Sequence, residues 1–300
     1  MRVTVTGASG LIGSRVVAAL MARGDEVTAL TRRPDRARER QSIEAVAWQA
    51  ESEPAPVAAL AGRDGVVHLA GEPIGQRWTA DAKERIRSSR ELGTSNLVAG
   101  LADAEPRPGV LVSASGVGYY GARGDERLDE SAPPGDDFLA QVCQVWERAA
   151  GEAEELRVRV AILRTGVVLD RSGGALAKML PPFRLGVGGP VAGGKQYVSW
   201  IHPDDLVALY LAALDGSEWS GPVNATAPEP ATNRELSRAL GRALRRPTVL
   251  PVPGLALKSL YGEMAWVVTT GQRAIPARAR ALGFAFRHSD LDEALRAALA

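Results

Sequence analysis

Three glycines near the start of the chain have the spacing of a loop that holds phosphate groups. GASGLIG at residues 7–13 reads G-x-x-G-x-x-G, directly after the β-branched run RVTVTG and at the start of an amphipathic helical pattern. Gly7 would allow a tight turn, Gly10 would let backbone approach a pyrophosphate, and Gly13 would let the helix pack on the strand. A structural turn without a ligand is the alternative interpretation. The other residues of the loop that we expect at a dinucleotide are Ser9, Leu11 and Ile12.

The residues after the second predicted strand, EVTALT, indicate which of two dinucleotides the protein would bind. A protein that binds NAD places Asp or Glu there, about 20 residues after the glycines, to hold the ribose hydroxyls. This chain has Thr31, Arg32 and Arg33, and its nearest acidic residues, at 25–26, lie at the wrong end of the strand. Guanidinium groups pair well with a 2′-phosphate. The sequence therefore predicts NADP(H), the alternative being two arginines that only face solvent.

The composition of the chain limits its domain organisation, its partners and its cellular location. A chain of 300 residues with 45% hydrophobic and 24% charged content suits one large globular domain or two modest ones. A formal net charge of +1 gives no reason to expect nucleic acid or a membrane as partner. One cysteine and three scattered histidines show no metal-site spacing, so we expect no metal. The first strand begins at Arg2 and no apolar run reaches ~18 residues, which favours a cytoplasmic protein.

Short β-branched runs alternate with longer helical patterns in the first half of the chain. This alternation predicts βαβ units and a parallel sheet. After Gly166, glycines, prolines and short elements dominate as far as Pro253. We expect strands at 2–7, 26–31, 43–48, 64–71, 109–115 and 158–166, and helices at 11–23, 80–102 and 138–156.

Motifs along the chain resemble the extended short-chain dehydrogenase/reductase superfamily. They are GASGLIG at 7–13, HLAGEPI at 68–74, SRELGTSNL at 89–97 and SASGVGYYG at 113–121. AGEPIGQRWT, LRTGVVLDRSGGAL, PPFRLGVGGPVAGGKQYVSWIHPDDL and GQRAIPARA resemble more closely the nucleoside-diphosphate-sugar epimerase family that carries a short C-terminal domain of unknown function.

The resemblance implies an α/β fold with a Rossmann doubly wound parallel sheet, helices on both faces, and a smaller C-terminal substrate-side region. In this division, residues 1–166 form the NADP-binding Rossmann domain, and 197–227 return to the sheet. Residues 167–196 and 228–250 lie on the substrate side, and 251–300 form a C-terminal helical domain of unknown function.

The superfamily carries its chemistry on a Ser after the fifth strand and on a Tyr-x-x-x-Lys helix, where the Lys lowers the pKa of the Tyr. Sugar epimerases commonly extend that helix to Tyr-x-x-x-Lys-x-x-x-Glu. Alignment on Glu147 puts Cys143 at the Lys position and Leu139 at the Tyr position, so both catalytic side chains are missing. No cation lies four residues from Cys143 on either side, so we expect it to be a small buried hydrophobe that borders the cofactor.

Other groups are candidates to replace the missing pair. Ser115 corresponds best to the superfamily's Ser, and Tyr119 or Tyr120 could donate a proton from the same loop. Aromatic packing beneath the loop is the alternative for each tyrosine.

Arg90 stands where the superfamily has the Asn of its Asn-x-x-Gly-Thr signature. Its guanidinium could reach the cofactor phosphates or a substrate anion, or form a surface ion pair. The remaining residues that the resemblance places at the cofactor are Leu69, Ala70, Gly71, Ser113 and Val167.

Residues 188–205, GGPVAGGKQYVSWIHPDD, match the region where extended members place substrate contacts. The candidate contacts are Lys195, Tyr197, Trp200 and His202. His202 with the acids that follow Pro203 reads equally well as the N-terminal cap of a helix.

The leading hypothesis is a cytoplasmic NADP(H)-dependent oxidoreductase or epimerase acting on a small carbonyl or sugar-nucleotide substrate. The alternative is a catalytically inactive protein that binds NADPH as a sensor or scaffold. We expect a small-molecule substrate and neither nucleic acid nor membrane as partner. A homodimer through paired helices, common in the superfamily, is compatible with the sequence but not decided by it.

Overall fold

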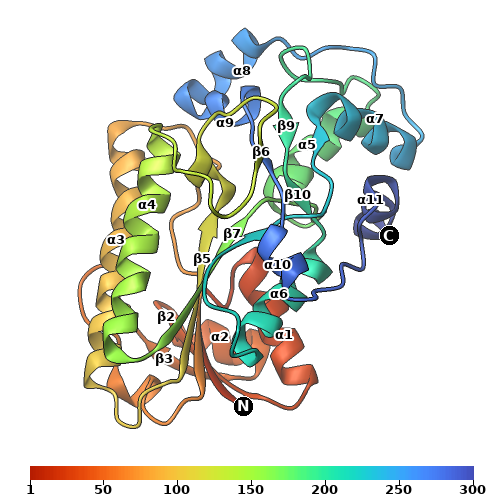
Figure 1. Ribbon diagram of the computed structural model, residues 1–300. Helices are drawn as coiled ribbons and strands as arrows, with labels where there is room; N and C mark the ends of the chain where they lie inside the picture. Colours follow the sequence, from red (N-terminus) through yellow and green to blue (C-terminus); the bar gives the residue numbers. More distant parts are fainter.

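The first strand of the chain lies in the interior of the main sheet, paired on both sides. The computed structural model describes residues 1–300, except the side chains of Arg40 and Ala256. The strands of the main sheet are β1 (Arg2–Thr6), β2 (Glu26–Thr31), β3 (Glu44–Ala47), β4 (Gly65–His68), β5 (Val110–Gly116), β7 (Arg159–Thr165) and β11 (Gly221–Ala225). They pair in parallel in the order β11-β7-β5-β4-β1-β2-β3, as Figure 1 shows in part. The expected α/β doubly wound fold is confirmed.

Helices cover both faces of this sheet because its strands present apolar side chains on both sides. Val110 and Val112 belong to the core beneath α1 (Leu11–Ala22) and α6 (Pro203–Asp215). Leu111, between them in the strand, belongs to the opposite core, beneath α3 (Ala80–Asp103). The other helix of that face is α4 (Phe138–Gly151), which packs along α3 (Figure 1).

Two elements are shorter than the sequence pattern predicts. β4 ends at His68 and not at Gly71, because the N–H groups of Leu69 and Ala70 donate to the Thr6 side chain and leave the ladder. The helix predicted for 138–156 ends as α4 at Gly151, and residues 152–156 continue as a 3₁₀ turn. The polar helix α2 (Pro34–Gln41) was not predicted.

A smaller region lies beyond the carboxyl ends of the strands. Its helices are α5 (Gly174–Arg184) and α7 (Asn233–Leu244). Two short strand pairings form outside the main sheet: β8 (Val167–Val168) with β10 (Trp200–Ile201), and β9 (Tyr197–Val198) with β12 (Ala231–Thr232). Between β10 and β12 the chain returns to the main sheet through α6 and β11.

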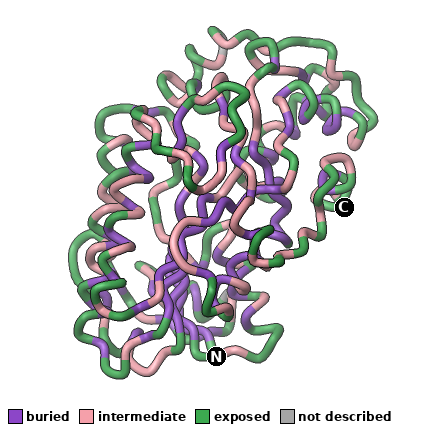
Figure 2. Tube along the Cα trace, viewed as in Figure 1, coloured by how far each residue is buried: buried purple, intermediate pink, exposed green. Residues whose placement is uncertain are grey.

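Residues 251–300 pack against several parts of the protein. Their elements are α8 (Gly254–Tyr261), α9 (Ala265–Thr269), β13 (Arg273–Ala274), α10 (Ala277–Ala281) and α11 (Leu291–Leu299). α10 lies on β11 and α11 on α7, while β13 pairs with β6 (Arg127–Leu128). In Figure 2 the buried residues concentrate along the sheet, whereas α8 is mostly exposed or half-buried.

Among the described residues, no helix combines the length and the apolar character that a membrane span requires.

Candidate functional site

The glycine loop has the geometry of a phosphate cradle. Gly7 has φ +66°, and a Cβ there would lie 2.7 Å from the backbone of Leu69. A Cβ on Gly13 would lie 2.1 Å from the Gly7 carbonyl oxygen, so both positions require glycine. Gly10 is the N-cap of α1 and supplies no side-chain acceptor to the first N–H groups of the helix. These groups and the helix dipole point to an anion at this end of α1.

A buried hydrogen-bond chain fixes the β4 loop against the glycines. Thr6 Oγ1 accepts the N–H groups of Leu69 and Ala70, each at 3.1 Å. Its single proton therefore goes to His68 Nδ1 at 2.7 Å, and His68 Nε2 donates to Thr94 Oγ1 at 3.0 Å. Burial, and next the Arg90 charge, lower the pKa of His68 to about 4, so its imidazole is neutral. Sequence reasoning assigned no role to His68 or Thr94, although both lie within the matched motifs.

Arg32 and Arg33 are exposed directly after β2, and neither side chain forms an ion pair with any described residue. The Arg33 N–H donates to Thr31 Oγ1 at 3.2 Å, at the turn where α2 begins. Gln41, at the other end of α2, donates to the Ala8 carbonyl at 3.0 Å and so joins this helix to the glycine loop. Two uncompensated positive charges thus lie beside the loop.

Arg90 lies behind the end of β4 and is half-buried. Its Nη1 donates to the carbonyl oxygens of Glu72 and Ile86, each at 3.0 Å, and its Cζ lies 4.9 Å from the Trp146 ring centroid. A Cβ on Gly71 would lie 3.2 Å from the Arg90 Cζ. The surface ion pair considered from the sequence is therefore absent among the described residues, and the guanidinium charge borders the β4 loop.

α4 lies where the superfamily places its catalytic helix. A Cβ on Gly118 would lie 3.2 Å from the Leu139 Cβ, and the Cys143 thiol lies 3.6 Å from the Gly116 carbonyl oxygen. Burial, and next the Glu147 carboxylate, raise the pKa of Cys143 to about 11. The thiol is therefore protonated at neutral pH and a poor nucleophile. Leu139 has no proton to transfer.

Ser115 belongs to a buried ionic network at the end of β5. Its hydroxyl donates to Glu147 Oε1 at 2.6 Å. Arg164 on β7 holds both oxygens of that carboxylate, at 2.9 Å from Nε and 2.8 Å from Nη2. The side chains of Glu147 and Arg164 are 11% and 4% exposed. Sequence reasoning used Glu147 as an alignment anchor and overlooked Arg164, although it is the Arg of LRTG.

The two tyrosines of the loop have different environments. Tyr120 is fully buried, and its hydroxyl donates to Asn224 Oδ1 at 2.7 Å and accepts from Arg164 at 3.1 Å. Burial raises the pKa of Tyr120 to about 12. These contacts contradict the expectation that Tyr120 could donate a proton to substrate, since that proton is held inside the protein. Tyr119 is half-buried over Arg164, whose Cζ lies 3.4 Å from the ring centroid, and its hydroxyl has no partner among the described residues.

Most of the chain matches a known protein family. Residues 3–224 match the NAD dependent epimerase/dehydratase family. The chain belongs to this family. Residues 252–298 match a domain of unknown function (DUF1731). The resemblance inferred from the motifs is confirmed.

Relatives match along nearly the whole chain. The epimerase family protein SDR39U1 homolog, chloroplastic, of Arabidopsis thaliana is 45% identical over 99% of this chain and 86% of its own length. The epimerase family protein Mb2239 of Mycobacterium bovis is 42% identical over 98% of this chain and 96% of its own. The crystal structure of human epimerase family protein SDR39U1 (isoform2) with NADPH has a TM-score of 0.89 and 35% identity, covering 99% of this chain and 98% of that one.

Three further predicted cofactor residues of this family member lie in three different elements. Ser9 is exposed in the glycine loop, whereas Ser113 is buried in β5 beside His68 and donates to the Ala114 carbonyl at 3.3 Å. Val167 is half-buried in β8, paired with Trp200.

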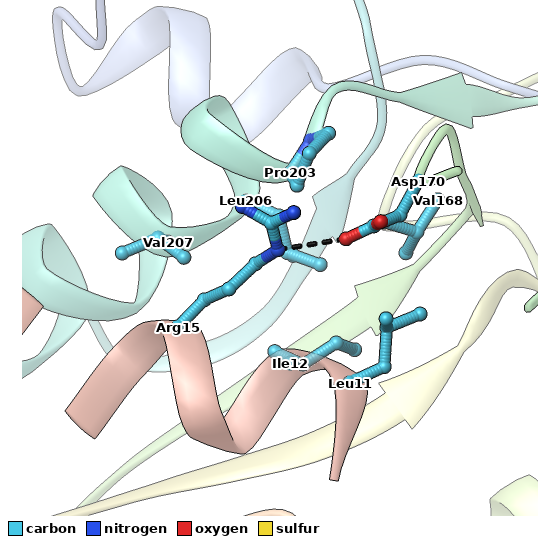
Figure 3. Close-up of a pocket in the computed structure, with 8 residues that line it drawn as sticks. All are labelled: Leu11, Ile12, Arg15, Val168, Asp170, Pro203, Leu206 and Val207. Atoms are coloured by element: carbon cyan, nitrogen blue, oxygen red, sulfur yellow. Dashed lines mark hydrogen bonds and ion pairs between the residues drawn. The ribbon is translucent and has the colours of Figure 1, made fainter. Parts of the chain in front are cut away.

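Leu11 and Ile12 line a narrow crevice between α1 and α6 (Figure 3). Arg15 reaches across this crevice from α1 to Asp170, with its Nε 2.7 Å from Oδ2. Burial opposes ionisation of Asp170, but hydrogen bonds from Ser172 and Arg15 lower its pKa below the usual value. The Arg15–Asp170 ion pair, which the sequence did not predict, therefore holds α1 in place after the glycine loop.

The four predicted substrate contacts do not gather into one site. Lys195 is exposed and Tyr197 is half-buried beneath Arg273, whose Cζ lies 4.8 Å from the ring centroid. Trp200 is 1% exposed and its indole donates to the Glu229 carbonyl at 3.1 Å, so it is a core residue. His202 is buried and caps α6, its Nδ1 accepting from the Asp204 N–H at 3.2 Å. The cap alternative therefore describes His202, and the burial of both residues does not support the substrate role predicted for them.

Proposed function

We propose that the protein binds NADP(H) and transfers hydride between the nicotinamide and a small carbonyl or sugar-nucleotide substrate. The observation that carries the proposal is the pair of exposed arginines, Arg32 and Arg33, after β2 and beside the glycine loop. A 2′-phosphate is the part of NADP(H) that a guanidinium recognises. The human relative whose crystal structure contains NADPH supports the same cofactor.

The residues present fit this cofactor. Gly7 and Gly13 leave the cradle free of side chains, and the N-terminus of α1 supplies N–H donors for the pyrophosphate. NADP(H), when bound, supplies the hydride that the reaction needs. Leu139 and Cys143 form an apolar surface beside the β5 loop, which excludes water from that side.

Tyr119 is the residue that would donate to a substrate oxygen, whereas Ser115, whose proton goes to Glu147, would only accept a hydrogen bond from substrate. The Ser115 hydroxyl is positioned by Glu147, and Arg164 prevents the carboxylate from turning away. The Tyr119 hydroxyl has no other described partner and remains able to donate a proton. General acid–base catalysis contributes roughly 10²–10⁴-fold, so we expect turnover to be slower than in relatives that keep Tyr-x-x-x-Lys.

Substitution of Arg32 tests the cofactor. A lost charge-assisted hydrogen bond costs about 1.5–3 kcal/mol, so Arg32→Ala should weaken NADPH binding roughly 10–100-fold and leave NADH binding unchanged. Affinities are measured by titration of cofactor fluorescence. Arg87→Ala, on an exposed arginine of α3 paired with Glu91, is the control. Equal losses for NADPH and NADH in Arg32→Ala would refute the assignment.

Substitutions at the β5 loop test turnover. Ser115→Ala and Tyr119→Phe should lower the rate of NADPH-dependent reduction of carbonyl or sugar-nucleotide substrates while NADPH affinity stays at the wild-type value. Tyr120→Phe is the informative comparison, because it should reduce stability through unpaired Asn224 and Arg164 groups more than it affects the rate. Rates unchanged in both Ser115→Ala and Tyr119→Phe would remove these residues from the mechanism.

An inactive NADPH-binding sensor or scaffold is the second candidate. The observation that favours it is the pair of unreactive side chains, Leu139 and the neutral Cys143, at the usual catalytic positions. A wild-type protein that binds NADPH tightly and turns over no substrate of either class would support this candidate against the enzyme.

A further inference from the structure

Two histidines that are far apart in the sequence meet at the N-terminus of α6. The rings of His202 and His288 are stacked, with centroids 3.7 Å apart and planes tilted by 33°. Asp204 Oδ2 lies 3.7 Å from His202 Nδ1 and 3.6 Å from His288 Nε2. Ligand atoms of the three residues all lie within 4.8 Å of one another.

The polar atoms of this cluster are poorly satisfied by protein groups. His202 Nε2 and His288 Nε2 are buried and have no hydrogen-bond partner among the described residues. The two side chains are 5% and 13% exposed. Separations of 3.6 and 3.7 Å to the carboxylate are too long for hydrogen bonds. Buried nitrogens without partners are rare in folded proteins, so the cluster is incomplete as a purely hydrogen-bonded arrangement.

The 3.6 Å between His288 Nε2 and Asp204 Oδ2 is close to the separation between ligands of one metal ion. His202, whose Nδ1 caps α6, would offer its unpartnered Nε2. Zinc binds imidazole nitrogen and carboxylate oxygen at 2.0–2.2 Å, which places the ligand atoms of a tetrahedral site roughly 3.4 Å apart. Two imidazoles and one carboxylate form a ligand set that zinc uses with an open fourth position. We propose that His202, Asp204 and His288 form a binding site for a divalent transition-metal cation, with Zn²⁺ as the cation that fits the ligand set best.

The groups around the cluster are compatible with a bound cation. Asp205 is occupied, because its two oxygens accept the N–H groups of Arg287 and His288, and this holds the His288 backbone beside α6. Arg15, a cation near His202, is paired with Asp170. Asp204 remains as the carboxylate that is not otherwise paired.

The site would connect the C-terminal segment to the sheet domain. His288 lies within the part of the chain that matches DUF1731, whereas His202 and Asp204 begin α6. Pro203, between them, lines the crevice of Figure 3 opposite Leu11 and Ile12. A cation here would link residues 252–298 to the helix that packs beside the glycine loop. The site takes no part in hydride transfer and does not depend on the proposed function.

Zinc titration of the full chain tests the site. The purified protein is treated with a chelator, dialysed and titrated with Zn²⁺ by calorimetry, and its thermal midpoint is measured with and without Zn²⁺. We expect one Zn²⁺ per chain and a higher midpoint, because a ligand that binds only the folded state stabilises it. Co²⁺ should give the visible absorption of a tetrahedral nitrogen–oxygen site. A wild-type chain that takes up no Zn²⁺ overturns the proposal.

Variants locate the bound ion. His288→Ala and Asp204→Asn should each weaken Zn²⁺ binding by more than the roughly 10–100-fold that outer-shell changes cost. Asp81→Asn is the matched control, since Asp81 is an acidic residue at the second position of α3, as Asp204 is in α6. Asp204 is half-exposed, so Asp204→Asn should fold even if His288→Ala does not, as checked by circular dichroism. Zn²⁺ affinity in Asp204→Asn equal to that of the wild type refutes the site.

Discussion

His68 links the glycine loop, β4 and α3 through a single buried imidazole. Both its nitrogens are engaged, and its burial opposes protonation. His68 fixes Thr6 and Thr94 and so helps to hold the β4 loop against the glycine loop. A histidine in such a position serves as a neutral bridge and not as a proton carrier.

The pH dependence of stability should reveal this bridge. The pKa of His68 is about 4 in the folded chain against 6.5 for a free side chain. Between these values the unfolded chain binds a proton that the folded chain rejects. The contribution of His68 is therefore fully present above pH 6.5 and is lost as the pH falls towards 4. At pH 5 the free energy of unfolding should be lower by about 2 kcal/mol.

Two measurements check this expectation. Urea unfolding at pH 7 and pH 5 gives the change in stability, and the NMR titration of the three imidazoles shows which histidine causes it. The His68 resonance should not titrate above pH 5. A His68 that titrates near pH 6.5 would contradict the neutral bridge.

At the scale of elements, two glycines of the loop differ in how much space a side chain would have. A Cβ on Gly13 would meet the Gly7 carbonyl oxygen at 2.1 Å, whereas a Cβ on Gly10 would meet it at 3.2 Å. Gly10 also has an ordinary φ of −75°. The third glycine therefore serves the packing of α1 on β1, and the second serves access to the loop.

Alanine substitutions should separate these two roles. Gly13→Ala overpacks the contact between helix and strand, which typically costs about 1–3 kcal/mol, and should also abolish NADPH binding. Gly10→Ala should leave the free energy of unfolding nearly unchanged and weaken NADPH binding. Urea unfolding and cofactor titration of both variants provide the test. A Gly13→Ala chain with wild-type stability and affinity would contradict the packing role.

The elements of the first half could be predicted because their signals are local. The glycine spacing, the β-branched runs and the arginines after β2 each depend on neighbouring residues. The end of β4 could not be predicted, since Thr6, from another strand, removes the N–H groups of Leu69 and Ala70 from the ladder.

The candidate site could be predicted only in part, because several of its contacts join residues that are far apart in the sequence. Arg164 and Tyr120 pair across the sheet, and His202 stacks on a residue near the end of the chain. The aromatic character of Trp200 does not indicate whether its side chain lies in the core or in a substrate site. Such contacts depend on the tertiary arrangement and leave no spacing in the sequence.

At the scale of the whole molecule, the C-terminal segment shares its cores with the rest of the chain. Phe284 and Phe286 pack against the core beneath α1 and α6. Leu295 of α11 is fully buried in the core that contains Leu236 and Leu240 of α7. The segment should therefore not unfold separately.

Leu295→Ala tests this integration. Removing a fully buried leucine side chain costs about 2–5 kcal/mol, so the whole protein should lose stability. Far-UV circular dichroism and tryptophan fluorescence should shift to the same lower midpoint. Leu255→Ala, at a leucine that is 81% exposed on α8, should change the midpoint little. Two separate transitions in Leu295→Ala would show that the segment is an independent unit.

The Glu130 carboxylate gives this integration a consequence for protein synthesis. One of its oxygens accepts the Asn224 N–H at 2.9 Å and the other accepts the Arg278 N–H at 3.1 Å, and burial raises its pKa. Domains begin to fold on the ribosome from the N-terminus. While the nascent chain is shorter than 278 residues, this acid lacks a donor that the finished protein provides. The interior around β7 and β11 is thus completed only after Arg278 has been synthesised.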